Sequence, residues 1–342
     1  MMCNLYNQFL RAIQDTNSTA NNSYLACLIS SVEAISDADG KDKTLSNYVK
    51  KLLNISMVEN FTLKPCEARE FAQLLGEAHF YLLCKNKGIA LSQIPKSNAE
   101  TPDFRLTEYD MYFEVKTFSP VSGENGISKA LENSLDANIK IEKQIEKGKK
   151  IAIGESITQP YGNRPYQKNN GVVTAIIETL IEKFKQNYKP GQFPNDKSFL
   201  VLNLSIIPPS RIDNCILRPA YPDNLLFEKA VSGELWMTTF GKPDMLILGN
   251  PESEGKPCIE STMVKLGILN NTDFKNISGI LFMIHPWKQD AEIWGLYNHE
   301  KYDLWNCRAP EIIKTLIAIA GTNWNDDTDS NGWQLQRKKT DH

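Results

Sequence analysis

The sequence lacks the features of a secreted, zinc-binding or membrane-spanning chain. Its seven cysteines are odd in number, lie far apart and form no CxxC pair, which argues against a disulfide framework and against a structural zinc site. No apolar run approaches the roughly 18–20 residues of a membrane span. The first residues mix charged with apolar side chains, so we expect no secretory leader, no membrane association and a location in the cytoplasm.

Motifs of nucleotide-driven and histidine–metal chemistry are absent as well. No GxxxxGK[ST] loop occurs, and no GxGxxG stands between a strand and a helix, so we expect no nucleotide-dependent motor in this chain. The histidines His79, His285 and His299 form no HxH or HxxxH pair, and we predict that they are packed or surface residues.

What the sequence does contain is the composition of a globular protein. Hydrophobic residues make up 41% and charged residues 23% of the 342 positions, which is enough to bury a real core. The formal net charge of −3 argues mildly against a protein that coats nucleic acid non-specifically. A net charge of this size is compatible with a local basic groove on an acidic protein.

Apolar periodicity predicts an alternation of helices and strands. Helical spacing recurs over much of 1–60 and over 66–87, 128–150, 172–187 and 311–320. Strand-like runs occupy 89–94, 103–106, 111–118, 199–207, 245–248, 279–285 and 292–297. This order predicts an α/β fold of the α+β kind, with a central mixed β-sheet flanked by helices. We expect an N-terminal helical region over 1–64, a main domain with insertions over 65–300, and a C-terminal helix and polar tail over 301–342.

The segment with the most specific chemistry is 101–118, TPDFRLTEYDMYFEVKTF. Asp103 opens one predicted strand, and the next contains Glu114 and Lys116. Because side chains alternate along a strand, Glu114 and Lys116 point to the same face. Charges within an otherwise apolar strand are costly unless a partner satisfies them. A divalent cation and a phosphate group are such partners.

A hairpin through the polar turn 107–110 would let the carboxylates of Asp103 and Glu114 converge. Mg²⁺ and Mn²⁺ prefer oxygen ligands, and these two carboxylates, the backbone carbonyl of Val115 and a substrate phosphate form a suitable set. The metal would stabilise developing charge and acidify a bound water, which Lys116 would orient. The alternative is an ordinary hairpin whose charges face water.

This segment resembles the PD-(D/E)xK nuclease superfamily, which has a restriction-endonuclease-like fold. Pro102-Asp103 matches the first half of the motif, and Glu114-Val115-Lys116 matches the second. The resemblance implies a further glutamate on the helix before the hairpin, which supports the metal directly or through water. Glu77 in the run GEAHFYLL fits that position. The alternative for Glu77 is a solvated charge on the helix surface.

The resemblance also implies Lys or Gln on the helix that follows the motif. Gln144 is the first candidate for a catalytic contribution, and Lys140 and Lys147 on the same helix face are candidates for binding nucleic acid. An ordinary solvated helix face remains the alternative for these three residues. The same motif letters recur as Pro243-Asp244 and Glu254-Gly255-Lys256, but in a stretch of Pro, Gly and Ser that predicts a turn instead of a strand.

The function implied by the resemblance is a metal-dependent nuclease that hydrolyses DNA phosphodiester bonds, most simply an endonuclease. Restriction or defence against phage is the first setting implied, and repair is the next. The resemblance also implies a homodimer or a partner subunit, and it leaves RNA open as a substrate. The alternative is a catalytically inactive nuclease-fold protein that binds nucleic acid or a protein partner. An unrelated scaffold that contains the motif by accident is the third possibility.

Overall fold

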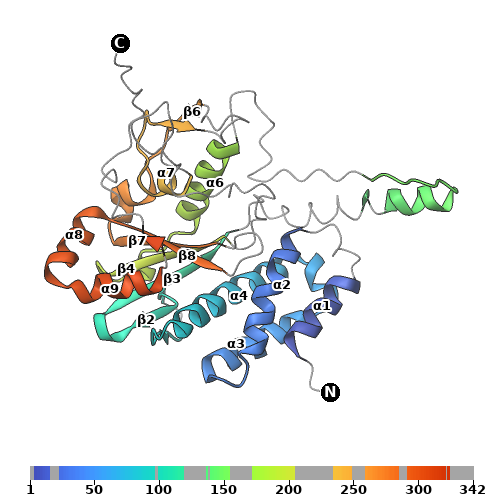
Figure 1. The fold of residues 1–342 in the computed structure, drawn as a ribbon, viewed down its shortest axis with the longest axis horizontal. Coiled ribbons are helices and arrows are strands. Elements are labelled where there is room, and N and C mark those ends of the chain that lie inside the picture. The colour runs from blue at the N-terminus through green and yellow to red at the C-terminus, as the bar shows by residue number, and fades with distance from the viewer. Residues whose placement is uncertain are drawn as a thin grey trace, which may run out of the picture. The chain divides into compact units, whose positions relative to one another are not determined.

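The chain forms two compact units in the computed structural model. The structure describes residues 4–15, 23–96, 99–118, 136–137, 139–154, 172–204, 234–248, 259–284, 291–320 and 322–323. Unit 1 comprises Met1–Leu83, Ser119–Asn163 and Ser205–Pro208, and unit 2 comprises Cys84–Phe118, Arg164–Leu204 and Pro209–His342. The division between the units falls within one helix, α4, which Figure 1 labels. The domain boundaries after residues 64 and 300 stay a prediction.

Unit 1 is helical in its described part, and the helices predicted over 1–60 and 66–87 are confirmed. Their bounds are Leu5–Asp15 for α1, Ser23–Asp37 for α2, Lys43–Ser56 for α3 and Pro65–Asn86 for α4. An aromatic cluster joins α1, α4 and the short turn between α3 and α4: the rings of Phe9 and Phe71 stack 5.2 Å apart, and those of Phe61 and Phe71 lie tilted 5.1 Å apart. Burial of these three rings against one another provides much of the local stability.

The ends of α3 and α4 follow from specific residues. Asp42 caps the start of α3, because its side chain accepts hydrogen bonds from the amides of Thr44 and Leu45. At the end of α4, the amide of Ile89 donates to the carbonyl of Cys84, and the amide of Gly88 donates to the carbonyl of Lys85. Gly88 has a φ of +77°, which suits a glycine that closes a helix in this way. The predicted stop at this glycine is confirmed.

Unit 2 is built on a mixed sheet, which confirms the predicted sheet type. The described strands are ordered β1-β2-β3-β4-β7-β8-β9. Their bounds are Ser92–Gln93, Phe104–Leu106, Met111–Thr117, Ser198–Asn203, Ile277–Ile284, Glu292–Tyr297 and Thr322–Asn323, in that order. The pairs β3/β4, β4/β7 and β8/β9 are parallel, and the pairs β1/β2, β2/β3 and β7/β8 are antiparallel. A separate antiparallel pair joins β5 (Leu246–Leu248) to β6 (Ile259–Thr262).

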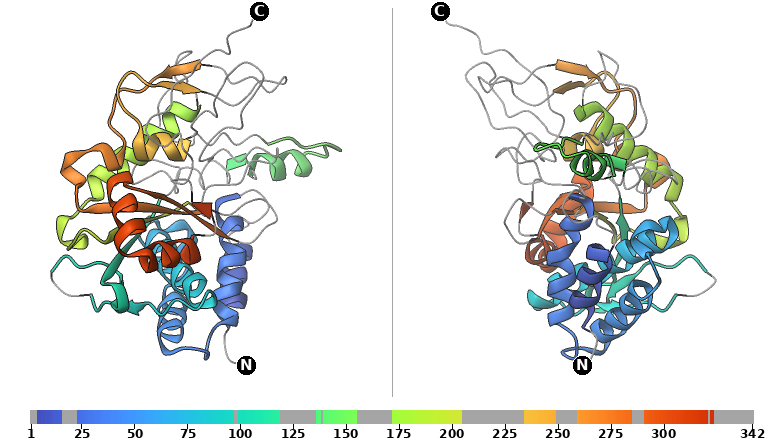
Figure 2. Two further views of the ribbon diagram at one scale, coloured as in Figure 1. Left: turned by 60° about the vertical axis from the view of Figure 1, so that its left-hand side comes forward. Right: turned by 90° about the vertical axis from the view of Figure 1, so that its right-hand side faces the viewer.

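Helices of unit 2 pack beside these strands. They are α6 (Val172–Asn187), α7 (Glu234–Phe240), α8 (His299–Arg308) and α9 (Pro310–Ile319), and α8 and α9 lie side by side next to the sheet (Figure 2). None of the helices in the described part of the chain is long and apolar enough to cross a bilayer.

The two faces of the sheet carry different side chains near β3. Phe113 stacks on Phe199 of β4 at 5.5 Å, and Phe199 in turn contacts Trp305 of α8 at 5.9 Å. One face is therefore covered by α8 at this point. Because side chains alternate along a strand, Glu114 and Lys116 of β3 point to the opposite face. The candidate site thus lies on the face away from α8.

Candidate active site

Asp103 lies where β2 separates from β3. Strand β2 pairs with β3 as far as Phe104, which lies opposite Phe113. Beyond that pair, the amide of Asp103 donates to the carbonyl of Phe113 at 3.1 Å, and the amide of Val115 donates to Oδ2 of Asp103 at 2.9 Å. The Asp103 carboxylate therefore binds the residue that directly follows Glu114. The hairpin thereby brings the two acidic residues to one place.

Glu114 is buried, yet its carboxylate has polar partners. Its Oε1 atom receives hydrogen bonds from Nζ of Lys116 at 2.7 Å and from Nε2 of Gln192 at 2.6 Å. The side chain of Glu114 is 4% exposed and that of Lys116 is 16% exposed, so Lys116 is the member of this pair that reaches towards solvent. Two donors on one oxygen offset much of the cost of burying the charge.

Gln192 is a contact that the sequence did not predict. It ends the short 3₁₀ turn η3 (Pro190–Gln192), which lies between α6 and β4. Strands β3 and β4 are parallel, with Glu114 beside Leu200. This long-range register is what brings the turn before β4 to Glu114. No local pattern around Gln192 signals the contact.

Glu77 lies in α4, within unit 1, whereas Asp103 and Glu114 belong to unit 2. Its side chain is buried, with 1% of the residue exposed. Tyr48 donates to Oε2 of Glu77 at 3.1 Å, and Gln73 donates to Oε1 at 3.3 Å. The alternative of a solvated helix charge is therefore wrong for Glu77. Its role in supporting a metal stays a prediction.

Gln144 and Lys140 lie in the helical residues 139–146 of unit 1, and Lys147 lies in the turn directly after them. The side-chain amide of Gln144 bonds the backbone of Ile153 twice, with Nε2 to the carbonyl at 2.8 Å and Oε1 to the amide at 3.4 Å. It thereby ties the segment 151–154 to the helix. Lys140 and Lys147 are exposed, in agreement with a solvated face. A contribution of the three residues to nucleic-acid binding or catalysis stays a prediction.

The second copy of the motif letters does not form a matching arrangement. Asp244 lies in a turn, is exposed and has a φ of +71°, and residues 254–256 lie outside the described residues. The strand β3, in contrast, holds Glu114 and Lys116 on one face. The described geometry therefore favours the first copy.

Two carboxylates and a carbonyl are the candidate metal ligands. No three His, Cys, Asp or Glu side chains come together in a metal-holding arrangement within the described ranges. The amide and carbonyl of one strand residue point to the same side, so the Val115 carbonyl points to the side on which Asp103 binds its amide. Asp103, Glu114 and Val115 then offer three hard oxygen donors. This set fits Mg²⁺, which keeps several waters and is usually bound by one or two carboxylates plus substrate phosphates.

No protein-family model, curated protein or solved structure matches this chain. The case for the site therefore rests on the geometry around Glu114 and on the motif itself.

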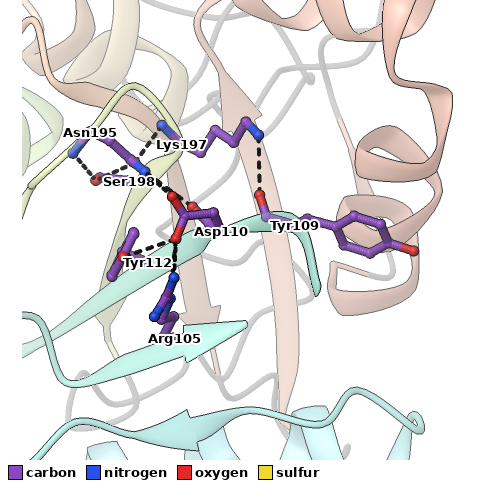
Figure 3. Close-up of polar contacts among 7 residues, drawn as sticks. All are labelled: Arg105, Tyr109, Asp110, Tyr112, Asn195, Lys197 and Ser198. Carbon is purple, nitrogen blue, oxygen red and sulfur yellow. Dashed lines mark hydrogen bonds and ion pairs between the residues drawn. The ribbon is translucent and has the colours of Figure 1, made fainter. Parts of the chain in front are cut away.

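A second polar cluster fixes the other end of the same hairpin (Figure 3). Asp110 ends the turn between β2 and β3 with a φ of +54°, and its Oδ1 accepts hydrogen bonds from Arg105 at 2.7 Å and from Tyr112 at 2.9 Å. Its Oδ2 accepts one from Asn195 at 3.1 Å. Lys197 adds a hydrogen bond to the carbonyl of Tyr109, whose ring points away from the cluster. These contacts tie the hairpin turn to the segment that enters β4.

The charge of Asp110 makes a small, pH-dependent contribution to stability. The hydrogen bond from Tyr112, followed by the one from Arg105, lowers the pKa of Asp110 below its usual value of 3.8. A carboxyl group with a lowered native pKa stabilises the fold above its unfolded pKa, and this contribution is lost as the pH falls through the native pKa.

We therefore expect Asp110→Asn to be less stable than wild type at pH 7 by less than about 1 kcal/mol, because the carboxylate is half exposed. The difference closes below the usual pKa of 3.8. Asparagine also adopts positive φ readily, so the backbone is not strained. Urea unfolding of both proteins at pH 7, 5 and 3 measures this. A difference that persists unchanged at pH 3 would show that the charge is not its origin.

Proposed function

We propose that this chain is a divalent-metal-dependent nuclease that hydrolyses phosphodiester bonds of DNA, with a restriction-endonuclease-like core. One observation supports the proposal above all others. Asp103 binds the amide next to Glu114, and the Glu114 carboxylate pairs with Lys116 at 2.7 Å on the same strand. Two carboxylates and a lysine brought together by one hairpin are the groups that metal-assisted phosphodiester hydrolysis needs.

Each residue has a separate role in this proposal. Asp103, Glu114 and the carbonyl of Val115 would hold Mg²⁺ or Mn²⁺, and this metal would supply charge stabilisation for phosphate oxygens and an acidified water. Lys116 has three ammonium donors, so it can remain bonded to Glu114 while it also donates to a phosphate oxygen or to the attacking water. Its partial exposure gives it access to a substrate. It thereby orients the nucleophile and offsets charge.

DNA is the proposed substrate, and the biological setting follows the resemblance. A net charge of −3 indicates that binding is local or that a partner adds affinity. We propose exposed Lys140 and Lys147 as contacts to the phosphate backbone, Glu77 and Gln144 as supporting residues, and a homodimer or a partner subunit as the working form. Restriction, phage defence or repair in the cytoplasm is the proposed setting.

A cleavage assay tests the proposal. Supercoiled plasmid and single-stranded DNA are incubated with the full chain and Mg²⁺ or Mn²⁺, with EDTA as the control. We expect metal-dependent cutting that falls by about 100- to 1,000-fold in Lys116→Met, in line with the loss of one charge-stabilising group. The matched variant is Lys301→Met, which removes a lysine of α8 that bonds Ser278 and the carbonyl of Lys275 instead. Lys301→Met should cut like wild type.

Two results would count against this function. Undiminished cutting by Lys116→Met would place the chemistry elsewhere in the chain. If wild type neither cuts DNA nor binds Mn²⁺, the alternative of a nuclease-fold protein that binds nucleic acid or a protein partner replaces the proposal. Circular dichroism of each variant establishes that it is folded.

A further inference from the structure

Gln192 is a polar side chain at the candidate site that lies outside the motif. Its Nε2 donates to Oε1 of Glu114 at 2.6 Å, across 78 residues of sequence. Lys116 donates to the same oxygen at 2.7 Å. The two donors differ in kind, because the lysine is charged and flexible whereas the glutamine is neutral and comes from a short turn.

The turn that carries Gln192 is held on both sides. Directly before Gln192, the amide of Gly191 donates to Oε2 of Glu100 at 3.3 Å. A Cβ atom at Gly191 would lie 2.7 Å from the carbonyl oxygen of Glu100, so the two backbones are in close contact. After it, the buried ring of Phe193 stacks on Tyr188 at 5.6 Å, and Asn276 donates to the Phe193 carbonyl at 3.1 Å. Gln192 is therefore presented to Glu114 by an anchored backbone.

The side-chain oxygen of Gln192 indicates that the hydrogen bond to Glu114 sets the orientation of the amide group. Its Oε1 is buried and has no hydrogen-bond partner among the described residues. A buried acceptor without a partner destabilises the fold. The reversed amide would place an oxygen against the Glu114 carboxylate, so the donor must face Glu114. The buried Oε1 would remain an acceptor beside Glu114 if this carboxylate held a hydrated metal.

We infer that Gln192 is a positioning residue that holds Glu114 in the orientation needed to bind the metal, an inference that rests on the proposed function. In the proposed function Lys116 divides its donors between Glu114 and the substrate, whereas Nε2 of Gln192 is directed at Oε1 of Glu114. Glu114 then retains its direction during the reaction. Hydrogen bonds to ligating carboxylates orient them and tune metal affinity.

Mn²⁺ binding by titration calorimetry tests this role separately from DNA cleavage. The variants are Gln192→Met, which keeps the volume but removes the donor, and Glu114→Gln, which removes the charge of the ligand. The matched control is Asn276→Ala, which loosens the same turn at Phe193 without touching Glu114. We expect Gln192→Met to bind Mn²⁺ about 10- to 100-fold more weakly, as is usual for a residue that supports a ligand. Asn276→Ala should bind like wild type, and excess Mn²⁺ should restore cleavage in Gln192→Met but not in Lys116→Met.

The outcomes separate this inference from the proposed function. Wild-type Mn²⁺ affinity in Gln192→Met, with binding lost in Glu114→Gln, overturns the inference and leaves the nuclease proposal intact. An equal loss in Asn276→Ala also overturns it, because loosening of the turn then explains the effect. Weaker binding in Gln192→Met alone, together with no DNA cleavage by wild type, supports the inference and counts against the nuclease proposal. If wild type binds no Mn²⁺, the result overturns both the inference on Gln192 and the nuclease proposal.

Discussion

Asp103→Asn protein should fold as stably as wild type and yet lose both Mn²⁺ binding and DNA cleavage. The side-chain oxygen of asparagine can accept the hydrogen bond that the amide of Val115 donates to Asp103 at 2.9 Å. Only the negative charge is lost. We expect cleavage to fall by more than about 100-fold, because losing the charge of a proposed metal ligand costs more than the 10- to 100-fold typical of a supporting residue.

The companion variant Asp103→Ala separates structure from chemistry. It removes the acceptor as well as the charge, so the buried amide of Val115 is left unsatisfied at a cost of about 1–3 kcal/mol in the free energy of unfolding. Urea unfolding and calorimetry compare both variants with wild type, and Asp110→Asn serves as an Asp-to-Asn control outside the site. Full cleavage by Asp103→Asn would show that Asp103 is not a metal ligand. Equal destabilisation of the two variants would contradict the proposed hydrogen-bonding role.

The second large effect concerns the stability of the buried ion pair. Lys116→Met should lower the free energy of unfolding by about 3 kcal/mol, because it leaves the carboxylate of Glu114 buried without its cation. The triple variant Glu114→Leu, Lys116→Met and Gln192→Met replaces the whole polar cluster with apolar side chains. We expect it to regain this loss, since well-packed apolar residues often match or exceed a buried ion pair in stability.

Denaturant unfolding of wild type, the single variant and the triple variant measures this difference. A domain with an ordinary stability of about 5–15 kcal/mol still folds after a loss of this size, so Lys116→Met remains usable in cleavage assays. A triple variant that is less stable than Lys116→Met would falsify the view that the cluster is kept for function at a cost to stability.

Local patterns in the sequence predicted the parts of the fold that local physics determines. The long helix α4 and its stop at Gly88 follow from apolar spacing and from the conformational freedom of glycine. Strand β3 follows from its alternating apolar residues. The mixed character of the sheet was predicted correctly from the order of helices and strands.

The sequence patterns did not predict α7 and α8, and they predicted the wrong length for β1. Helix α8 buries only Tyr302 and Trp305 on a polar helix, so it has little apolar periodicity. Helix α7 is short and buried on all sides, and it shows no polar face. Strand β1 was expected over 89–94 but covers only Ser92–Gln93. Periodicity cannot reveal a helix or strand whose burial is decided by neighbours far away in the sequence.

In the candidate site, too, the local arrangement could be predicted from the sequence and the partners of the helix residues could not. Asp103 directly precedes β2, and Glu114 and Lys116 lie on the adjacent strand β3, so a hairpin was enough to predict that they meet. The partners of Glu77 and Gln144 could not be foreseen, because a helix position does not reveal which distant group it will bond. Glu77 bonds Tyr48, 29 residues earlier, and Gln144 bonds Ile153, nine residues later.

The contact between Gln192 and Glu114 also has a consequence for the order of folding. Asp103, Glu114 and Lys116 belong to one hairpin, which can close quickly because its loop is short. Gln192 joins them only when β4 pairs in parallel with β3, and closing that longer loop carries a larger entropic cost. The hairpin can therefore gather its charged residues before the sheet is complete. In the proposed function, the full support of Glu114 would therefore be reached only when β4 has paired with β3.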